Sequence, residues 1–141
     1  MLNREKNKLS QKQIAAGIIS YAGKILIGQR KKGKDLEFLW ELPGGKLEQG
    51  ETLKQCLQRE LLEEMGLNIE VGSLFMSSTY NYPFGCFVIN AFFAETSSFN
   101  IPKICEHEKV LWVEPQKLLD YEFSPADVPI IKAYLKSLNF K

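Results

Sequence analysis

The distribution of hydrophobic and polar residues predicts two strands in the first third of the chain. Residues 14–20 (IAAGIIS) form an apolar run typical of a buried strand, whereas residues 24–30 (KILIGQR) alternate between apolar and polar. The YAG between them predicts a turn into the returning strand. After a basic, glycine-containing loop, residues 39–45 (LWELPGG) predict a short extended segment that ends at Pro43 and two glycines.

Residues 52–66 carry the start and stop signals of a helix. Thr52 is a favourable N-cap, and Gln55, three residues later, completes a capping box with it. Gly66 is suited to the position just beyond the last turn, where the backbone often becomes left-handed. The sequence therefore predicts one central helix with defined ends.

The second half of the chain predicts further strands and a closing helix. Residues 69–96 favour two or three strands with a turn near PFG, and residues 108–115 (EKVLWVEP) favour another. Residues 127–138 (DVPIIKAYLKSL) predict a helix with Asp127 near its N-terminus. This order of elements predicts an α/β (α+β) fold, in which a mixed β-sheet has helices on both faces.

Composition predicts one globular domain. The 141 residues are 45% hydrophobic and 25% charged, with a net charge of +1, so no overall field draws the chain to nucleic acid or an acidic membrane. The longest apolar run, residues 86–94, is too short to span a bilayer. Residues 1–12 are polar and lysine-rich, so we expect a flexible arm there and a single domain over residues 13–141. Three widely spaced cysteines predict reduced thiols and a cytoplasmic protein.

Three glutamates of the predicted helix share one stripe of its surface. At about 100° per residue, Glu60, Glu63 and Glu64 fall within one stripe roughly 100° wide, beside the apolar residues at 57, 61 and 65. The carboxylates therefore border the buried side, where like charges oppose helix formation and partial burial raises pKa values. Arg59 is expected to compensate only one charge, that of Glu63 four residues later.

The residues of the stripe alone leave two interpretations open. A surface helix can carry a solvated acidic face, since glutamate is a common helix former. Alternatively, clustered carboxylate oxygens can bind a divalent cation such as Mg²⁺ or Mn²⁺, which would resolve the repulsion. The residues around the stripe favour the second interpretation.

Those surrounding residues resemble the Nudix box. Gly45, Glu51 and the run RELLEEMGL at residues 59–67 have the residue types and spacing of that motif at every fixed position. The segments IAAGIIS…GKILIGQR and LWELPGGKLE before the run, and EHEKVLWVEP…FSPADVPII after it, are similar to the MutT-like branch of the family. The resemblance covers all but the first dozen and last few residues, and implies a Nudix-type α/β/α sandwich.

The resemblance implies Mg²⁺-dependent hydrolysis of a nucleoside diphosphate linked to another group. In MutT-like members a nucleoside triphosphate becomes a monophosphate and pyrophosphate, a reaction that needs neutralised phosphate charge and a positioned water. A hydrolase of ADP-ribose or a dinucleotide is the alternative within this chemistry, and a non-catalytic nucleotide-binding module is an alternative of another class. We expect no nucleic acid polymer or membrane as partner, and either a monomer or a homodimer.

The resemblance also assigns residues to roles. The Gly44 carbonyl and the stripe would hold the metal ion, while Glu51 would orient Arg59 or contribute to the same site. The expected metal ligands are Gly44, Glu60, Glu63, Glu64 and Glu106. The expected catalytic residues are Glu51, Arg59, Glu63 and Glu106.

Glu106 is assigned from its position six residues before Trp112. In MutT-like proteins a carboxylate at this spacing completes the metal site or acts as general base. Glu108 on the same segment is the alternative. His107, the single histidine of the chain, is expected to be a polar loop residue.

Arg30, Leu42, Tyr80 and Asp127 are the expected substrate contacts. Arg30 ends the second strand, where MutT-like proteins direct an arginine toward the phosphates, and Tyr80 is one of several aromatic residues that could stack on a base. Asp127 replaces the base-binding asparagine of the MutT archetype. An ionised Asp only accepts hydrogen bonds, which suits a cytosine amino group, and PADVP is similar to the branch that hydrolyses CTP. Oxidised guanine, as in 8-oxo-dGTP, and simple helix capping by Asp127 remain open.

Overall fold

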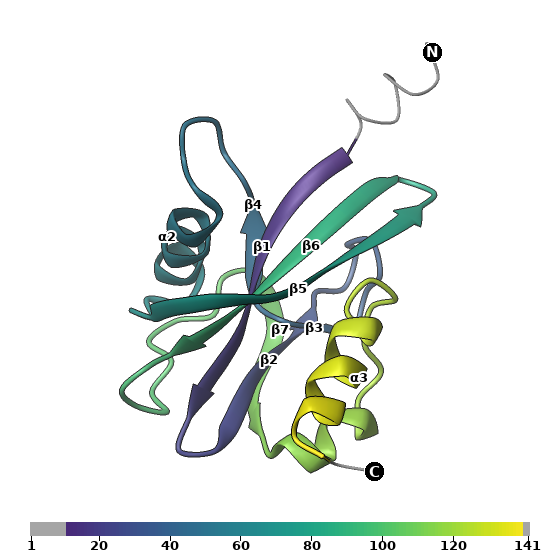
Figure 1. Cartoon of the computed structure of the whole chain (residues 1–141). Coiled ribbons are helices and arrows are strands. Elements are labelled where there is room, and N and C mark those ends of the chain that lie inside the picture. The colour runs from purple at the N-terminus through teal and green to yellow at the C-terminus, as the bar shows by residue number, and fades with distance from the viewer. Residues whose placement is uncertain (1–10, 140–141) are drawn as a thin grey trace.

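The computed structural model describes residues 11–139. Most of the expected N-terminal arm, residues 1–10, lies outside the described residues. Gln11 and Lys12 already belong to the first strand, so the folded domain begins two residues earlier than expected. The chain folds into one sheet with helices against it (Figure 1).

The strands and helices follow the hydrophobic pattern closely. The segment over residues 69–96 resolves into two long strands, and Lys24–Arg30 has the predicted bounds. The strands are β1 (Gln11–Tyr21), β2 (Lys24–Arg30), β3 (Trp40–Glu41), β4 (Gly44–Lys46), β5 (Glu70–Tyr82), β6 (Gly85–Glu95) and β7 (His107–Val113). The helices are α2 (Leu53–Met65), the 3₁₀ helix η1 (Pro115–Asp120) and α3 (Val128–Ser137).

The sheet is mixed, as predicted. Its main order is β3-β2-β1-β6-β5, with β4 also paired to β1 and β7 to β2. The β1–β6 pair is parallel, and the other pairs are antiparallel. Strand β1 pairs with β4 near its start and with β2 near its end, so the sheet opens between β4 and β2.

Alternate residues of β1 face opposite hydrophobic layers. Ala15 and Ile19 pack toward α2, whereas Ala16 and Ile18 pack in the layer that includes α3. Because both faces of β1 are buried, its sequence is continuously apolar instead of alternating. The two helices therefore cover opposite sides of the sheet (Figure 1), which is the α/β/α arrangement expected from the sequence.

Helix α2 has both predicted caps. The Thr52 hydroxyl accepts a hydrogen bond from the Gln55 backbone N–H, and the Gln55 side chain accepts one from the Thr52 N–H. Gly66 ends the helix with φ of 63°, in the left-handed region. These caps fix where the helix starts and therefore which residues face the sheet. No helix within residues 11–139 is long and apolar enough to cross a membrane.

Candidate active site

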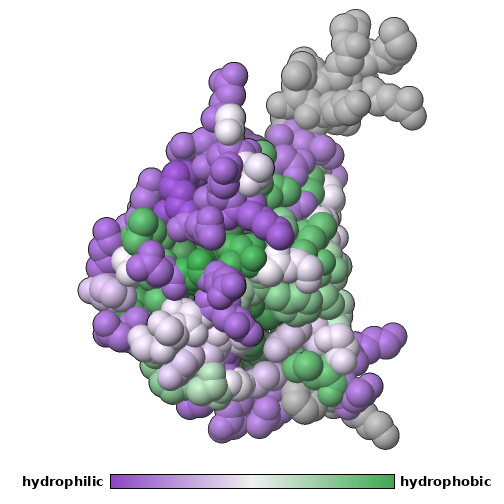
Figure 2. Space-filling model, turned by 60° about the vertical axis from the view of Figure 1, so that its left-hand side comes forward, coloured by the Kyte–Doolittle hydropathy of each residue, from purple (hydrophilic) through white to green (hydrophobic). Residues whose placement is uncertain are grey.

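A cavity of about 920 Å³ lies beside the sheet. Its lining comes from β1, β2, β3, β4, α2, the β5–β6 hairpin and the first residue of β7, His107, together with the loops that follow β2, β3 and β4 and those that precede β7 and α3. A space-filling view (Figure 2) shows a hydrophobic hollow surrounded by hydrophilic side chains on one face of the molecule. A concave site that combines apolar walls with convergent charged groups is typical of a small-molecule site.

The glutamate stripe of α2 faces this cavity. Leu57, Leu61 and Met65 are fully buried against the sheet, which places the adjacent Glu60 and Glu64 at the edge of the core. Glu63, on the other side of the stripe, is more exposed, with 60% of its side chain accessible. The predicted border position of the three carboxylates is therefore confirmed.

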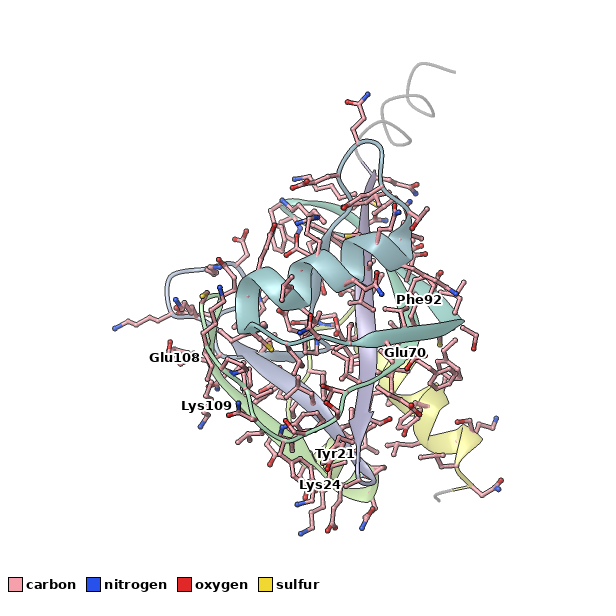
Figure 3. The ribbon with its side chains drawn as sticks, turned by 90° about the vertical axis from the view of Figure 1, so that its left-hand side faces the viewer. Tyr21, Lys24, Glu70, Phe92, Glu108 and Lys109 are labelled. Atoms are coloured by element: carbon pink, nitrogen blue, oxygen red, sulfur yellow. The ribbon has the colours of Figure 1, made fainter. Side chains whose placement is uncertain are left out.

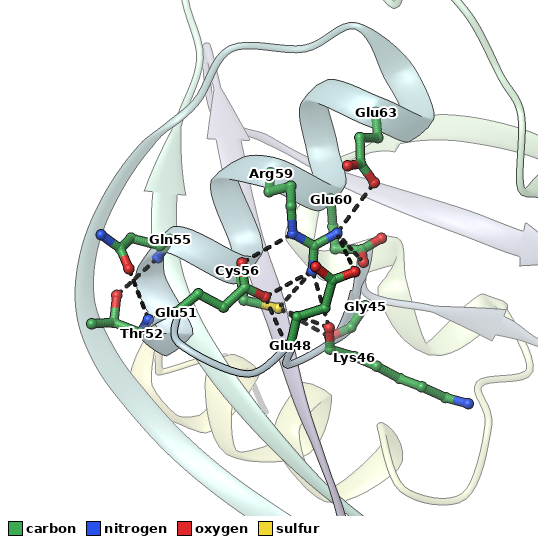
Figure 4. Close-up of polar contacts among 10 residues, drawn as sticks. All are labelled: Gly45, Lys46, Glu48, Glu51, Thr52, Gln55, Cys56, Arg59, Glu60 and Glu63. Atoms are coloured by element: carbon green, nitrogen blue, oxygen red, sulfur yellow. Dashed lines mark hydrogen bonds and ion pairs between the residues drawn. The ribbon is translucent and has the colours of Figure 1, made fainter.

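Arg59 contacts four carboxylates, not one as expected (Figure 4). Its Nε and Nη2 donate to the two oxygens of Glu51 at 3.0 and 2.8 Å, a bidentate pair. Its Nη1 donates to Glu60 at 2.8 Å and to Glu63 at 3.2 Å, and Glu48 lies 3.6 Å away. The expectation was wrong because helical spacing cannot include Glu48 and Glu51, which precede the helix.

Glu51 is held firmly in its charged form. Hydrogen bonds from Arg59, and then from the backbone N–H of Glu48, lower the pKa of Glu51 to about 2. Both oxygens of Glu51 are thus engaged with the protein itself. This geometry supports the orienting role for Glu51 toward Arg59 over direct contact with a ligand.

Glu64 has the opposite environment. Its Oε2 is buried and makes no hydrogen bond within the described residues. Burial first, and then the neighbouring Glu60 carboxyl, raise the pKa of Glu64 to about 9. An unpartnered buried oxygen beside a second carboxylate is costly without a compensating positive charge, so these two residues fit a divalent cation.

The two glycines of β4 make this arrangement sterically possible. A Cβ on Gly44 would lie 1.9 Å from the Ala15 carbonyl oxygen, and one on Gly45 would lie 2.2 Å from Glu60 Cδ. The backbone of β4 can therefore lie close to both β1 and the Glu60 carboxyl. Within residues 11–139 no three His, Cys, Asp or Glu side chains are grouped closely enough to hold a metal ion, and Glu63 accepts a hydrogen bond from Arg59.

Glu106 lines the cavity, and Glu108 does not. Lys34 Nζ lies 2.6 Å from Glu106 Oε2, and this hydrogen bond lowers the pKa of the carboxyl. Glu108 is exposed at the outer edge of the molecule (Figure 3). Of the two candidates, only Glu106 is therefore placed to complete a site on α2.

A second charged cluster lies on the adjacent strands β3, β2 and β7. Arg30 Nη1 donates to Glu41 Oε1 at 2.9 Å, and His107 Nε2 lies 2.9 Å from Glu41 Oε2. Burial alone would raise the pKa of Glu41, but the contacts with His107 and Arg30 lower it. His107 is buried in a strand, so the expectation of a polar loop residue was wrong.

Asp127 points into the protein instead of capping its helix. Its side chain makes no capping hydrogen bond to α3, and its Oδ2 accepts one from the Leu42 backbone N–H at 2.8 Å. Burial, and then the negative charge of Glu41, raise the pKa of Asp127 to about 8. Both Leu42 and Asp127 line the cavity, as their assigned roles require.

Tyr80 does not line the cavity, whereas Tyr82, Phe84 and Phe87 do. The Tyr80 ring packs on Tyr82, with centroids 4.5 Å apart, and Tyr82 and Phe84 are stacked at 4.9 Å. The Tyr82 hydroxyl accepts a hydrogen bond from the Ala126 backbone N–H at 2.9 Å, which ties the hairpin to the loop that carries Asp127. The assignment of Tyr80 as a substrate contact stays a prediction, and its neighbours on the hairpin lie closer to the cavity.

Comparison with known proteins identifies the family. The family model of the NUDIX domain matches residues 11–134, nearly the whole described chain. The chain belongs to the Nudix family. Two curated relatives and one solved structure support this membership over most of their length.

The relatives of this Nudix protein act on nucleotides according to their names. It is 33% identical to the CTP pyrophosphohydrolase of Escherichia coli, over 87% of this chain and 90% of that one. It is 35% identical to the 8-oxo-dGTP diphosphatase of Haemophilus influenzae, over 90% and 93% respectively. The solution structure of the Escherichia coli ORF135 protein matches with a TM-score of 0.76 and 32% identity, over 90% of each chain.

Most predicted site residues of this Nudix hydrolase meet at one cavity. The residues that line it include Arg30, Leu42, Gly44, Glu60, Glu63, Glu64, Glu106 and Asp127. Arg59 donates hydrogen bonds to Glu60 and Glu63, and Glu51 holds Arg59 in place. Sequence reasoning missed Glu41, because a single Glu in an extended segment gives no periodic signal. It also missed the contact of the buried His107 with Glu41, because that contact joins two strands far apart in the sequence.

Proposed function

We propose that this Nudix hydrolase converts a nucleoside triphosphate into a nucleoside monophosphate and pyrophosphate, with Mg²⁺ as its cofactor. The observation that carries the proposal is the unpartnered, buried Glu64 oxygen beside Glu60, on the wall of a cavity that also contains Arg30 and Asp127. One end of this cavity thus offers carboxylates for a cation, and another offers polar groups for a nucleobase.

In such a reaction, one group of residues would bind the metal ion. Glu60 and Glu64, with Glu63, Glu106 and the Gly44 carbonyl near them, would hold the ion. When bound, Mg²⁺ neutralises charge on the phosphate oxygens and lowers the pKa of a coordinated water. Hydrolysis then joins the water oxygen to phosphorus, breaks one P–O–P bridge and releases one proton.

Two carboxylates are candidates to accept that proton. Glu63 and Glu106 are both exposed at the cavity, and each forms an ion pair that a substrate could replace, with Arg59 and Lys34 respectively. Glu51 is unsuited to the role, because Arg59 and a backbone N–H already occupy its oxygens. A general base must reach the attacking water within hydrogen-bond distance.

The base would bind at the end of the cavity formed by Leu42, Asp127 and the hairpin aromatics. Asp127 is oriented by the Leu42 N–H and is buried, so it can discriminate between donors and acceptors on a base. Tyr82 and Phe84 offer ring faces nearby. Cytosine and oxidised guanine both have N–H groups that suit this carboxyl, and the named relatives act on CTP and 8-oxo-dGTP.

A substrate screen tests the proposal. Ordinary and oxidised nucleoside triphosphates, with ADP-ribose and a dinucleotide in the same panel, would be incubated with and without Mg²⁺ while pyrophosphate release is measured. We expect release only with Mg²⁺ and only from triphosphates. Glu64→Gln should reduce kcat at least about a hundredfold, since catalytic metal ions contribute several kcal/mol.

Glu70→Gln is the matched control for that variant. It makes the same chemical change at an exposed position on β5 (Figure 3) that is not part of the cavity lining, and should keep wild-type turnover. Hydrolysis of ADP-ribose in preference to every triphosphate would replace the proposed substrate class. Full activity of Glu64→Gln, or no activity on any phosphate anhydride, would contradict the proposal itself.

A further inference from the structure

Three adjacent strands present a partly buried row of charged side chains, and the proposed chemistry does not explain why His107 belongs to it. Glu41 on β3 stands between Arg30 on β2 and His107 on β7, with each of its carboxylate oxygens 2.9 Å from one neighbour. Only Arg30 and Glu41 have substantial exposure to the cavity, whereas His107 is 4% exposed. This row of side chains therefore runs from the nearly buried His107 to Arg30 and Glu41, which are exposed at the cavity.

The orientation of Arg30 depends on two bonds. Its Nη1 donates to Glu41, and its Nε donates to the Asp35 carbonyl at 2.7 Å. A guanidinium has five N–H donors, so further donors remain for a ligand. Bidentate contact with phosphate oxygens requires a defined plane of the guanidinium, and Glu41 is the charged group that sets it.

Glu41 in turn has its second oxygen held by His107. Because the ionised carboxylate only accepts hydrogen bonds, Nε2 of His107 is the donor in this contact. Nδ1 of His107 is buried and makes no hydrogen bond within residues 11–139. A buried imidazole with one unsatisfied nitrogen is unfavourable, which argues that the contact with Glu41 has a use.

The backbone of β2 is shaped to admit the imidazole. A Cβ on Gly28 would lie 2.5 Å from His107 Cδ2 and 2.7 Å from Nε2, closer than any real contact allows. Gly28 pairs with Glu41 in the sheet, and the β2–β7 register shifts between Gln29 and Arg30. The glycine and the register shift together bring the ring over β2 to reach Glu41.

We propose that His107 is a positioning residue, which holds the Glu41 carboxylate and through it the guanidinium of Arg30 toward the phosphates of the nucleotide. This inference rests on the proposed function, because it needs an anionic substrate in the cavity. His107 forms part of the cavity wall but is only 4% exposed, and its Nε2 is engaged by Glu41, so its effect on the substrate passes through Glu41 and Arg30.

A double-mutant cycle tests this dependence. Affinity for a non-hydrolysable triphosphate analogue with an imido bridge would be measured by calorimetry for wild type, Arg30→Ala, His107→Ala and the double variant. A charge-assisted hydrogen bond predicts a loss of about tenfold for Arg30→Ala and a smaller loss, about fivefold, for His107→Ala. The double variant should match Arg30→Ala alone within about twofold, because the two changes remove the same interaction.

Kinetics and a conservative variant separate positioning from a general structural role. The losses should fall mainly in KM, since phosphate contacts exist in both ground and transition states. His107→Gln keeps an N–H donor and should restore affinity to within about threefold of wild type. Lys109→Ala, an exposed change on the same strand at the outer edge of the molecule (Figure 3), is the control and should bind like wild type.

Gly28→Ala provides a second, independent test. The added methyl must displace the imidazole, so this variant should lose affinity as His107→Ala does. In the His107→Ala background the ring is absent, and Gly28→Ala should then have no further effect. Wild-type affinity in Gly28→Ala would overturn the inference.

The outcomes distinguish the inference from the proposed function. Independent, multiplying losses in the Arg30–His107 cycle, in a wild type that binds and hydrolyses triphosphates, would overturn the positioning role alone. A wild type that neither binds the analogue nor hydrolyses any triphosphate would overturn both. Loss of thermal stability in His107→Ala with unchanged affinity would show that His107 only fills the core.

Discussion

Two glutamates one helical turn apart, Glu60 and Glu64, have different environments. Glu60 accepts a hydrogen bond from Arg59 at 2.8 Å, whereas Glu64 keeps a buried oxygen without a partner. Residue type and helical spacing are the same for both, so the difference arises from Arg59, which reaches one and not the other. A cation in the cavity would give the Glu64 carboxyl a positively charged partner, as Arg59 does for Glu60.

Asp127 gives a prediction about pH and stability. Its pKa in the folded protein, about 8, lies above its ordinary value of 3.8 because of burial and the charge of Glu41. Between these values the folded chain holds a proton that the unfolded chain has released, so stability falls as pH rises from about 4 to 8. At its steepest this contribution changes by about 1.4 kcal/mol per pH unit.

Asp127→Asn should remove this dependence, because an amide does not titrate. In urea unfolding between pH 4 and 9, the free energy of unfolding of the variant should increase relative to that of the wild type as pH rises. This difference should become constant above about pH 8. Asp120→Asn, at an exposed position, is the matched control and should run parallel to wild type. Parallel curves for Asp127→Asn would show that Asp127 is ionised in the folded protein throughout.

At the scale of elements, the sequence predicts most of the fold but not the contacts between strands. Helix α2 and strand β2 are encoded locally, by caps and by alternation, and these were confirmed. The parallel pairing of β1 with β6 joins segments about 75 residues apart, and no local pattern specifies it. The Arg30–Glu41–His107 cluster depends on such pairings, which explains why His107 was expected in a loop.

The same reasoning applies to the site. The glutamate stripe could be predicted because three members lie on one helix, where spacing determines direction. Sequence could not single out which aromatic residue lines the cavity, because several aromatic residues of one hairpin fit the same description. Tyr82 lines the cavity through its place opposite the Ala126 loop, which is a tertiary contact.

The C-terminal cap of α2 gives a prediction about stability. Gly66 has φ of 63°, and a Cβ there would lie 3.1 Å from Pro102 Cβ. Gly66→Ala should therefore cost more than the roughly 1 kcal/mol expected for a left-handed alanine. Gly23 also has positive φ but no atom within 4 Å of the added Cβ, so Gly23→Ala should cost only that smaller amount.

Chemical denaturation of both variants measures the difference between them. Helix α2 carries the glutamate stripe close to this cap, so Gly66→Ala should also weaken Mg²⁺-dependent turnover, which Gly23→Ala should leave unchanged. Equal losses in the free energy of unfolding for the two alanine variants would mean that Pro102 moves away from the added methyl group without cost. A cost below that of Gly23→Ala would contradict the cap geometry.

At the scale of the whole molecule, the cavity lies where the two hydrophobic layers end. The hydrophobic residues on one face of β1 pack against α2. Those on the other face pack in the layer that includes α3 and the loop before it. The short strands β3 and β4, with Leu42 and Pro43 between them, supply Glu41, Leu42 and Gly44 to the cavity lining. The glutamates of α2 and Asp127, which immediately precedes α3, therefore come from opposite sides of the sheet and line one cavity.

Because the carboxylates are part of the packing of α2 against the sheet, metal binding should stabilise the whole domain. A ligand that binds only the folded state raises stability by RT ln(1 + [L]/Kd), about 1.4 kcal/mol at ten times Kd. For a domain of this size that corresponds to a rise in Tm of about 4 °C. Thermal unfolding of the wild type with Mg²⁺ should show this rise, and NaCl at equal ionic strength should not produce it.

Glu64→Gln should respond differently from wild type in the same experiment. Without metal it should unfold at or above the wild-type temperature, because burial and Glu60 raise the pKa of Glu64 to about 9 and glutamine removes the cost of keeping this carboxyl protonated at neutral pH. With Mg²⁺ its Tm should stay constant, since the unpartnered carboxylate oxygen is gone. Glu70→Gln should retain the full rise. An equal rise in Glu64→Gln would place any bound Mg²⁺ elsewhere, and the acidic stripe of α2 would then be only a charged surface of the helix.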